Sequence, residues 1–514
     1  MILLGIISLF ARAYGQVSDD YALSVAADAS GFALAGGTWS WGGQNNIFLV
    51  KTDPDGIGEW ATICGGAGND EALAITPTSD GGYAVAGLTF TYGIGGDMIV
   101  LKVTGTGSLS WARVIGGTYD DEARGIAELS DGGYVVTGRA FIWGNGYDLI
   151  FFKLNSDGSY GGWMRYFGGT ANDYGNWVSP TSDGGFVITG GTTSYGPVGG
   201  DNTPVLLLNS SGIRVWFSVI GGNSSGSTIG NSVIQTSDGG FAVAGITSDF
   251  GAGGYDFIVF KLNSSGSLVW ARTIGGPDND YAYSIAEMDD GGLVIAGTTE
   301  SYGLGSNEAM VVKMSSDGGF LWARTFGGFE AGADDYDYGK AITETPDGLV
   351  ALAGSTSSFG LSSGLYAFLV TMGPDGEYPA CVSVCDPNIT NISPSTTSVS
   401  GYNNISLTIS SPSVSYSAVE PNQEALCLPV DGTEGQVAPG PITCRAVPGG
   451  LIFAAGENIG LSVYSADGRL VYSGQLQKGE NRINLDRGVY LWTTKPAWAG
   501  SRARLPYRGN AVVR

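Results

Sequence analysis

A repeat of about 52 residues, extending from Asp20 to Gly376, constrains the fold of this chain more than any other feature of its sequence. Each copy has an aromatic residue or a leucine after its central turn. That position recurs seven times, at Phe32, Tyr83, Tyr134, Phe186, Phe241, Leu293 and Leu349. Gly-Gly pairs also recur, at 65/66, 116/117, 168/169, 221/222, 275/276 and 327/328. The chain is therefore expected to contain seven copies of one structural unit.

Each copy divides into four short β-rich runs. In the sixth copy these are residues 281–287, 293–299, 309–314 and 320–326. The first two runs are separated by Asp-Gly-Gly and the last two by Ser-Asp-Gly, and these residues tolerate the positive φ of tight hairpin turns. Four antiparallel strands in each copy are typical of a propeller blade, and a closed ring removes exposed strand edges. The sequence therefore predicts an all-β chain, with a seven-bladed β-propeller over residues 17–385 followed by a small C-terminal β-sandwich.

The connections between strands predict two unlike faces. The long connections, from the fourth strand to the next blade and from the second strand to the third, share one face, which we call the decorated face. The opposite face carries only the short Asp-Gly turns. Because functional groups concentrate on loops held by a rigid scaffold, we expect ligands to bind at the decorated face.

The composition excludes several classes of function. The chain has no histidine, which removes Ser-His-Asp and Cys-His nucleophile systems and His-ligated metals. Its net charge of −24 disfavours nucleic-acid binding. No segment after residue 16 has 18 uninterrupted apolar residues, so no transmembrane segment is predicted.

A column of acidic residues precedes the innermost strand of the blades. It comprises Asp20, Asp70, Asp121, Asp173, Asp280 and Asp337, with Thr228 in the fifth copy. The favoured interpretation is that each carboxylate closes its own loop by accepting hydrogen bonds. The alternative is Ca²⁺, which prefers carboxylate and carbonyl oxygens. A second acidic column on the same face supplies Asp97 and Asp148. Together with Asp70, Asp121 and Asp173 of the first column, these two residues are the metal candidates.

Two aromatic columns also follow the repeat. One is Trp41, Tyr92, Trp143, Tyr195, Phe250, Tyr302 and Phe359, each followed by Gly. It is either a ring of stacking platforms for sugars or, as we favour, a packing wedge between blades. The other is Trp60, Trp111, Trp163, Trp216, Trp270 and Trp322 on the outer strand, where inter-blade packing is expected.

Residues that break the repeat are the candidates for ligand contact. On the innermost strand one position reads Ser24, Ala74, Gly125, Trp177, Ser232, Ser284 and Ala341, so that Trp177 is the exception among small residues. Arg139 is a second singular residue, and Trp39 adds an aromatic ring near Trp41. With Trp143 these make four tentative ligand-binding residues, and local repacking is the alternative for each.

The two ends of the chain differ from the repeats. Residues 1–16 contain an apolar run followed by small residues, which predicts a secretory signal peptide. Residues 386–445 are rich in Ser, Thr, Pro and Asn and predict a linker. Disulfides are expected among four clustered cysteines, with three pairings open, and the spacing disfavours zinc. These cysteines are Cys381, Cys385, Cys427 and Cys444.

The C-terminal stretch 446–514 resembles a known family. Its VYSADGRLV segment, the step at Gly488–Tyr490 and the terminal Val512–Arg514 are similar to the C-terminal sorting domain of type IX secretion substrates. The resemblance implies a β-sandwich that directs export through the type IX secretion machinery, although the insert PAWAGSRARLP departs from the pattern. Residues 19–385 resemble the Gly-rich propeller repeats of bacterial surface proteins, which implies a fold and surface exposure rather than an activity.

Together these features favour a secreted or cell-surface propeller that binds a glycan or protein ligand without catalysis. Two other hypotheses stay open. One is an extracellular carbohydrate-active enzyme that uses carboxylates, and the other is a structural surface protein.

Overall fold

The computed structural model describes residues 9–377 with short gaps at 16–17, 41–42, 94, 142–145, 197–199, 223–224, 304–305, 328–335 and 359–363. Beyond residue 377 it describes only the backbone of seven strands between residues 442 and 513. The chain divides into two compact units, the repeats and the C-terminal strands. In the described part, no helix is long and apolar enough to cross a membrane.

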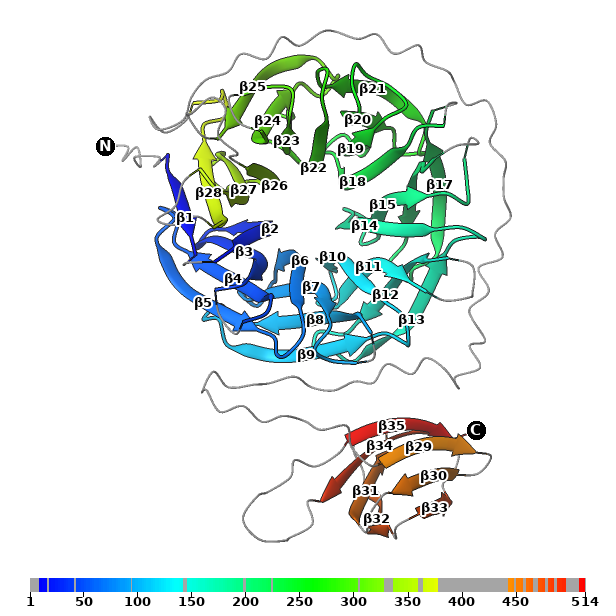
Figure 1. The fold of residues 1–514 in the computed structure, drawn as a ribbon. Helices are drawn as coiled ribbons and strands as arrows, with labels where there is room; N and C mark the ends of the chain where they lie inside the picture. Colours follow the sequence, from blue (N-terminus) through cyan, green and yellow to red (C-terminus); the bar gives the residue numbers. More distant parts are fainter. Residues whose placement is uncertain are drawn as a thin grey trace. The chain divides into compact units, whose positions relative to one another are not determined.

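The repeats form seven four-stranded antiparallel sheets arranged as blades around one axis (Figure 1). This confirms the predicted seven-bladed β-propeller. Blade 1 contains β2 (Asp20–Asp28), β3 (Gly31–Thr38), β4 (Asn46–Thr52) and β5 (Gly58–Cys64). Blade 2 contains β6 (Asp70–Pro77), β7 (Tyr83–Thr89), β8 (Asp97–Val103) and β9 (Leu109–Ile115). Blade 3 contains β10 (Glu122–Glu128), β11 (Tyr134–Ala140), β12 (Asp148–Leu154) and β13 (Tyr160–Phe167).

The remaining blades follow the same order. Blade 4 contains β14 (Asp173–Pro180), β15 (Phe186–Thr192), β16 (Thr203–Leu208) and β17 (Arg214–Ile220). Blade 5 contains β18 (Thr228–Gln235), β19 (Phe241–Thr247), β20 (Asp256–Leu262) and β21 (Leu268–Ile274). Blade 6 contains β22 (Asp280–Glu287), β23 (Leu293–Thr299), β24 (Glu308–Met314) and β25 (Phe320–Phe326). In each blade the first strand lies innermost (Figure 1).

Blade 7 draws its strands from both ends of the repeat region. Its inner strands are β26 (Asp337–Glu344), β27 (Val350–Thr356) and β28 (Tyr366–Met372), and its outer strand is β1 (Ala11–Tyr14). Strand β1 pairs antiparallel with β28, with Ala11 opposite Val370. It covers the edge of β28 that would otherwise expose unpaired backbone groups.

The position of β1 differs from the expected boundaries. Residues 11–14 fall inside the predicted signal peptide and before the predicted start of the propeller at residue 17. In the structure they are part of the ring, so cleavage near Gln16 would remove the outer strand of blade 7. Repeat counting missed this strand because it carries neither the Gly-Gly pair nor an Asp-Gly turn.

The blades pack face to face through apolar side chains from their second and third strands, which are buried almost throughout. The outer tryptophans extend this packing, as expected. The indole Nε1 of Trp60 donates to the Gly105 carbonyl in the next blade at 2.9 Å, and Trp216 donates to Ser264 at 2.9 Å. The Trp60 ring covers Gly107, whose φ of 79° and lack of a side chain permit this close approach.

The contact from blade 7 to blade 1 has no tryptophan and uses β1 instead. The Tyr14 hydroxyl donates to the Gly56 carbonyl at 2.7 Å, and Arg12 Nε donates to the Asp55 carbonyl at 2.9 Å. The Phe10 ring lies against Gly56, in the place that Trp60 takes at Gly107. The N-terminal strand therefore replaces the outer tryptophan where the ring closes.

The C-terminal unit contains two antiparallel sheets. One has the order β29 (Ile442–Val447), β30 (Gly450–Ala455), β33 (Gly479–Asn484). The other has the order β32 (Leu470–Leu476), β31 (Ile459–Ser465), β34 (Gly488–Lys495), β35 (Arg508–Val513). Packing of these sheets as a sorting-type sandwich stays a prediction. Cys381, Cys385 and Cys427 lie outside the described residues, as does the side chain of Cys444 in β29.

Candidate functional site around the propeller axis

The acidic column closes loops within the blades. Asp70 accepts hydrogen bonds from the hydroxyl groups of Thr89 and Thr91, the latter at 2.6 Å, and from the Gly66 N–H at 3.0 Å. Asp173 has the same kind of donors, in Thr192, in Ser194 at 2.6 Å and in Gly169 at 2.9 Å. Burial raises the pKa of both carboxyl groups, and these hydrogen bonds oppose the rise. The loop-closing interpretation is confirmed for these two residues.

Blade 5 shows that the hydrogen bond matters more than the identity of either partner. Its column residue is Thr228, and Asp249 stands where other blades carry the second hydroxyl. Asp249 Oδ2 accepts from the Thr228 hydroxyl at 3.3 Å and from the Gly222 N–H at 3.2 Å. The carboxylate and hydroxyl have exchanged places, and the loop is still closed by the same type of bond.

The Gly-Gly pairs make room for these groups. A Cβ at Gly168 would overlap the Asp148 carboxylate and lie 3.0 Å from Asp173 Oδ2, while a Cβ at Gly169 would meet Ser194. Asp148 and Asp173 therefore lie close together between blades 3 and 4. Burial, and secondly the charge of Asp173, raise the pKa of Asp148 to about 6.

The remaining metal candidates are dispersed among the blades. Asp121 Oδ1 accepts the Phe141 N–H at 3.1 Å, in a blade where Ala140 replaces the usual threonine. Asp97 is buried at the start of β8. Among the described residues, no three His, Cys, Asp or Glu side chains form a group that could hold a metal ion.

The aromatic column that follows the second strand packs between loops. The hydroxyl groups of Tyr92, Tyr195 and Tyr302 donate to the carbonyls of Gly65, Gly168 and Gly275, at 3.1, 2.6 and 2.8 Å. This confirms the packing-wedge interpretation for the three tyrosines. Trp41, Trp143 and Phe359 lie outside the described residues.

The structure separates the other three tentative ligand residues. Trp177 packs against the apolar cluster between blades 4 and 5, and its Nε1 donates to Ser179 Oγ at 3.1 Å. Arg139 forms an ion pair with Glu122, and its guanidinium lies 4.4 Å from the centre of the Tyr147 ring. Trp39 is 42% exposed at the end of β3. No contact among the described residues joins these three side chains into one site.

A different set of side chains faces the axis. Each innermost strand contains a β-bulge, as between Ala22 and Ser24 in β2, which inserts one residue without a partner. The inserted residues form one layer: Leu23, Leu73, Arg124, Asn176, Asn231, Tyr283 and Lys340. Half-buried residues two positions earlier form a second layer nearer the decorated face: Tyr21, Glu71, Glu122, Tyr174, Ile229, Tyr281 and Tyr338.

Sequence reasoning missed these layers because it followed the position just after the bulge, where side chains turn between the blades. A bulge re-aims a side chain and shifts the alternation of a strand by one residue. The sequence signal that could have identified the axis residues is the variety of residue types at their positions. The first and third residues after the start of the strand vary from Leu to Lys, while the residue between them is always Ala or Gly.

In blades 3 to 5 the axis side chains satisfy one another, and we call Glu122, Arg124, Arg139, Asn176 and Asn231 the paired arc. Glu122 binds both arginines. Arg124 also donates to Asn176 at 2.8 Å, Asn176 donates to Asn231 at 3.1 Å, and Asn231 donates to the Ala282 carbonyl at 2.8 Å. The two arginines hold the pKa of Glu122 below its usual value against the effect of burial.

In blades 6 and 7 the axis side chains are not satisfied in this way, and we call Tyr281, Tyr283, Tyr336, Tyr338 and Lys340 the tyrosine arc. The rings of Tyr281 and Tyr283 stack 6.4 Å apart, and those of Tyr336 and Tyr338 stack 6.3 Å apart. Lys340 Nζ lies 3.7 Å from the centre of the Tyr283 ring and 5.2 Å from that of Tyr338.

The polar atoms of the tyrosine arc have unused hydrogen-bonding capacity. Within the part of the chain that the structure describes, neither the four hydroxyl groups nor Lys340 Nζ has a hydrogen-bond partner. Burial lowers the pKa of Lys340 to about 8, and the nearby charge of Glu71 opposes this effect.

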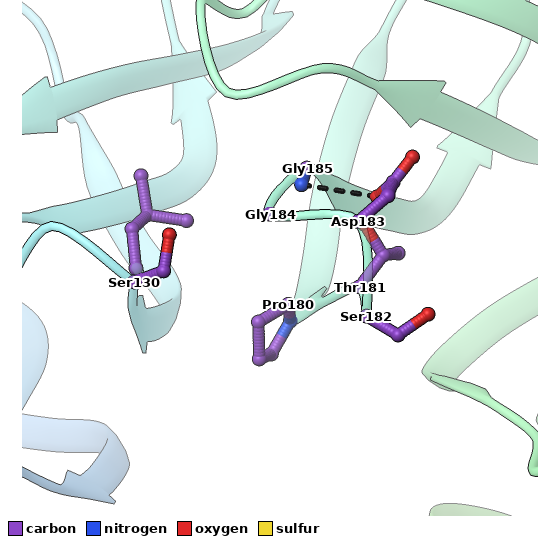
Figure 2. A pocket seen from close by; sticks show the side chains of 8 residues that line it. Ser130, Pro180, Thr181, Ser182, Asp183, Gly184 and Gly185 are labelled. Carbon is purple, nitrogen blue, oxygen red and sulfur yellow. Dashed lines mark hydrogen bonds between the residues drawn. The ribbon is translucent and has the colours of Figure 1, made fainter.

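A shallow pocket lies on the opposite face between the first turns of blades 3 and 4 (Figure 2). Pro180 occupies the strand end where Glu128 and Gln235 in other blades bind the serine of the preceding turn. The pocket is lined by turn residues, and its carboxylate, Asp183, already accepts hydrogen bonds from Thr181 and Gly185. It offers a ligand less chemistry than the tyrosine arc does.

No family model and no curated protein matches the chain. Among solved structures, it is similar to the extracellular domain of a putative hybrid two-component system from B. thetaiotaomicron, with 12% identity, 98% of this chain and 57% of that chain covered, and a TM-score of 0.40. It is similar to puromycin hydrolase, with 11% identity, 94% and 61% covered, and a TM-score of 0.44. It is also similar to PorZ, a surface component of the type IX secretion system of Porphyromonas gingivalis, with 12% identity, 96% and 81% covered, and a TM-score of 0.25. The chain spans less than two thirds of the first two proteins, and likenesses this distant carry no information on its ligand.

Proposed function

We propose that the propeller is a non-catalytic binding module and that its ligand is held at the tyrosine arc. The observation that carries the proposal is the group of four tyrosine hydroxyls and one ammonium without hydrogen-bond partners among the described residues. Polar groups near a protein interior are usually satisfied by protein or solvent, and such a concentration of open donors suits a ligand. Tyrosine adds a large contact area at low cost in side-chain entropy.

The position of the arc supports the same proposal. Tyr281 and Tyr338 directly follow the residues that begin β22 and β26, and Tyr336 precedes β26, so the arc lies at the end of these strands where the decorated face begins. The rigid innermost strands hold the rings in place, which favours recognition by preformed contacts.

Two further expectations belong to this proposal. Export and surface exposure rest on the resemblance of residues 446–514 to type IX sorting domains, and on the predicted signal peptide only if its cleavage leaves β1 in place. Calcium binding stays a prediction, which thermal unfolding with calcium and with EDTA would test. If the melting temperature is the same in both, the calcium part of the proposal is wrong.

A glycan array and a set of surface proteins, probed with the full chain, test the binding proposal. We expect a hit that the double variant Tyr281→Ala/Tyr338→Ala loses. Tyr119→Ala is the matched control, because Tyr119 is an exposed tyrosine in a loop of the same face. If the double variant retains every hit, the tyrosine arc is not the binding site.

A further inference from the structure

The ammonium of Lys340 indicates the charge of the ligand that the tyrosine arc would bind. Its recorded contacts are the faces of Tyr283 and Tyr338, and it has no acceptor oxygen among the described residues. An ammonium has three N–H donors, and a ring face satisfies none of them fully. Lys340 is half-buried, so its ammonium has lost part of its hydration without gaining an acceptor from the described residues, and an anionic oxygen is the addition that would stabilise it most.

The charges around the axis agree with an anionic partner. Arg124, Arg139 and Lys340 lie with Glu71 and Glu122, and Glu122 is already bound by both arginines. Glu300 adds a further negative charge near Tyr281, Tyr283 and Tyr338. The rest of this strongly acidic chain is screened over about 8 Å at physiological salt. These three cations and three carboxylates around the axis nearly balance, whereas the whole chain has a net charge of −24.

The rings beside Lys340 define the rest of the ligand. The ring planes of Tyr336 and Tyr338 are nearly parallel, with an angle of 7° between them, and those of Tyr281 and Tyr283 are inclined by 19°. Flat aromatic faces that carry free hydroxyl groups suit a sugar ring, which has an apolar C–H face and a rim of hydroxyl groups.

We propose that the tyrosine arc binds a carbohydrate that carries a carboxylate, with the sugar ring on the tyrosines and the carboxylate on Lys340. This inference rests on the proposed binding function and specifies its ligand. Lys340 Nζ donates to the carboxylate, and the tyrosine hydroxyls bind the sugar hydroxyls. Protein ligands with acidic side chains are less suited, because they lack a flat ring to cover both stacked pairs.

Calorimetric titration of the full chain with matched oligosaccharides tests this ligand class. The probes are oligomers of galacturonate, glucuronate and mannuronate, and the same oligomers after reduction of each carboxyl group to an alcohol. We expect at least one uronate to bind about tenfold or more tightly than its reduced form. Lys340→Met should remove that difference, and Arg214→Met, which changes a cation on the outer strand of blade 4, should preserve it.

The pH dependence supplies a second readout. The groups that face Lys340 are Glu71, Tyr283 and Tyr338, and the charge of Glu300 also acts on the two tyrosines. Because only the protonated amine binds an anion strongly, uronate affinity should fall between pH 7 and pH 9.5 in the native chain and stay level in Lys340→Met.

The outcomes separate this inference from the function on which it rests. Equal affinity for a uronate and its reduced form would overturn the carboxylate and leave the binding function standing. If no oligosaccharide binds but the array shows another ligand lost in Tyr281→Ala/Tyr338→Ala, the carbohydrate class is wrong and the site is right. If no probe of any kind depends on the tyrosines, both are wrong.

Discussion

The two sides of the propeller axis use equivalent innermost strands of different blades, but their polar side chains differ in how they are bound. In the paired arc every charged or amide side chain named above has a protein partner, and Glu122 neutralises two arginines. In the tyrosine arc Lys340 meets only ring faces. Both Arg124 and Lys340 are inserted at the bulge of an innermost strand, so backbone position does not explain the difference.

This comparison indicates a division of labour between stability and binding. A polar network whose side chains bind one another stabilises contacts between blades and has less capacity left for a ligand. A site whose hydrogen-bond donors have no partner lowers the free energy of unfolding, and proteins commonly keep such sites where function requires them. Equivalent substitutions in the two arcs should therefore change stability in opposite directions.

The largest effect is expected at Arg124. Arg124→Met leaves Glu122 with one arginine and removes the hydrogen bond to Asn176. Because the arginine side chain is 25% exposed, we expect a loss of about 2 kcal/mol rather than the full cost of breaking a buried pair. Urea unfolding measures this, with Arg214→Met as the surface control. A loss no larger than that of the control would contradict the paired arc.

Lys340→Met should have the opposite sign. Methionine keeps the apolar contact with the tyrosine rings and removes a half-buried charge, so we expect a gain of about 1 kcal/mol at pH 7. The folded-state pKa near 8 lies below the ordinary value of 10.5, so the unfolded chain binds more protons between these values. The native chain should therefore gain stability as the pH rises from 8 to 10.5, and the advantage of the variant should disappear.

The same urea titrations at pH 7, 9 and 10.5 measure this change. A destabilised variant at pH 7, or an advantage that does not depend on pH, would show that Lys340 is paired.

The smallest changes in stability are expected when the hydroxyl groups of Tyr21 and Tyr281 are removed. The Tyr21 hydroxyl donates to Glu71 Oε1 at 2.5 Å and accepts from Asn45 Nδ2 at 2.6 Å, whereas Tyr281 has no such bonds among the described residues. Tyr21→Phe should cost about 1 kcal/mol, and Tyr281→Phe should change stability by less than about 0.5 kcal/mol. Thermal unfolding of the two variants side by side tests this, and equal losses would contradict the open hydroxyl of Tyr281.

The sequence predicted the features that recur in every blade. Seven blades, the outer tryptophans and the loop-closing role of Asp70 and Asp173 follow from residues that recur because every blade needs them. Trp177 and Arg139 were singled out as breaks in the repeat. The structure uses Trp177 in packing between blades and Arg139 in an ion pair with Glu122.

The axis residues escaped sequence reasoning for a specific reason. A bulge in each innermost strand places Lys340 and Tyr283 on the axis, and a bulge has no signature in an Ala- and Gly-rich strand. Strand β1 escaped as well, because its pairing with β28 joins residues about 350 positions apart and depends on the edge left by blade 7. Both features arise from how the strands are arranged in space rather than from a local pattern.

The most direct test of the account is the titration of the Lys340 side chain by NMR in the native chain, with Lys340→Met to assign the signal. The account predicts a midpoint near pH 8, and a shift to higher pH when a bound oligouronate supplies the missing acceptor. A midpoint at the ordinary value near 10.5 without ligand would show that Lys340 is already solvated or paired, and would contradict an open tyrosine arc.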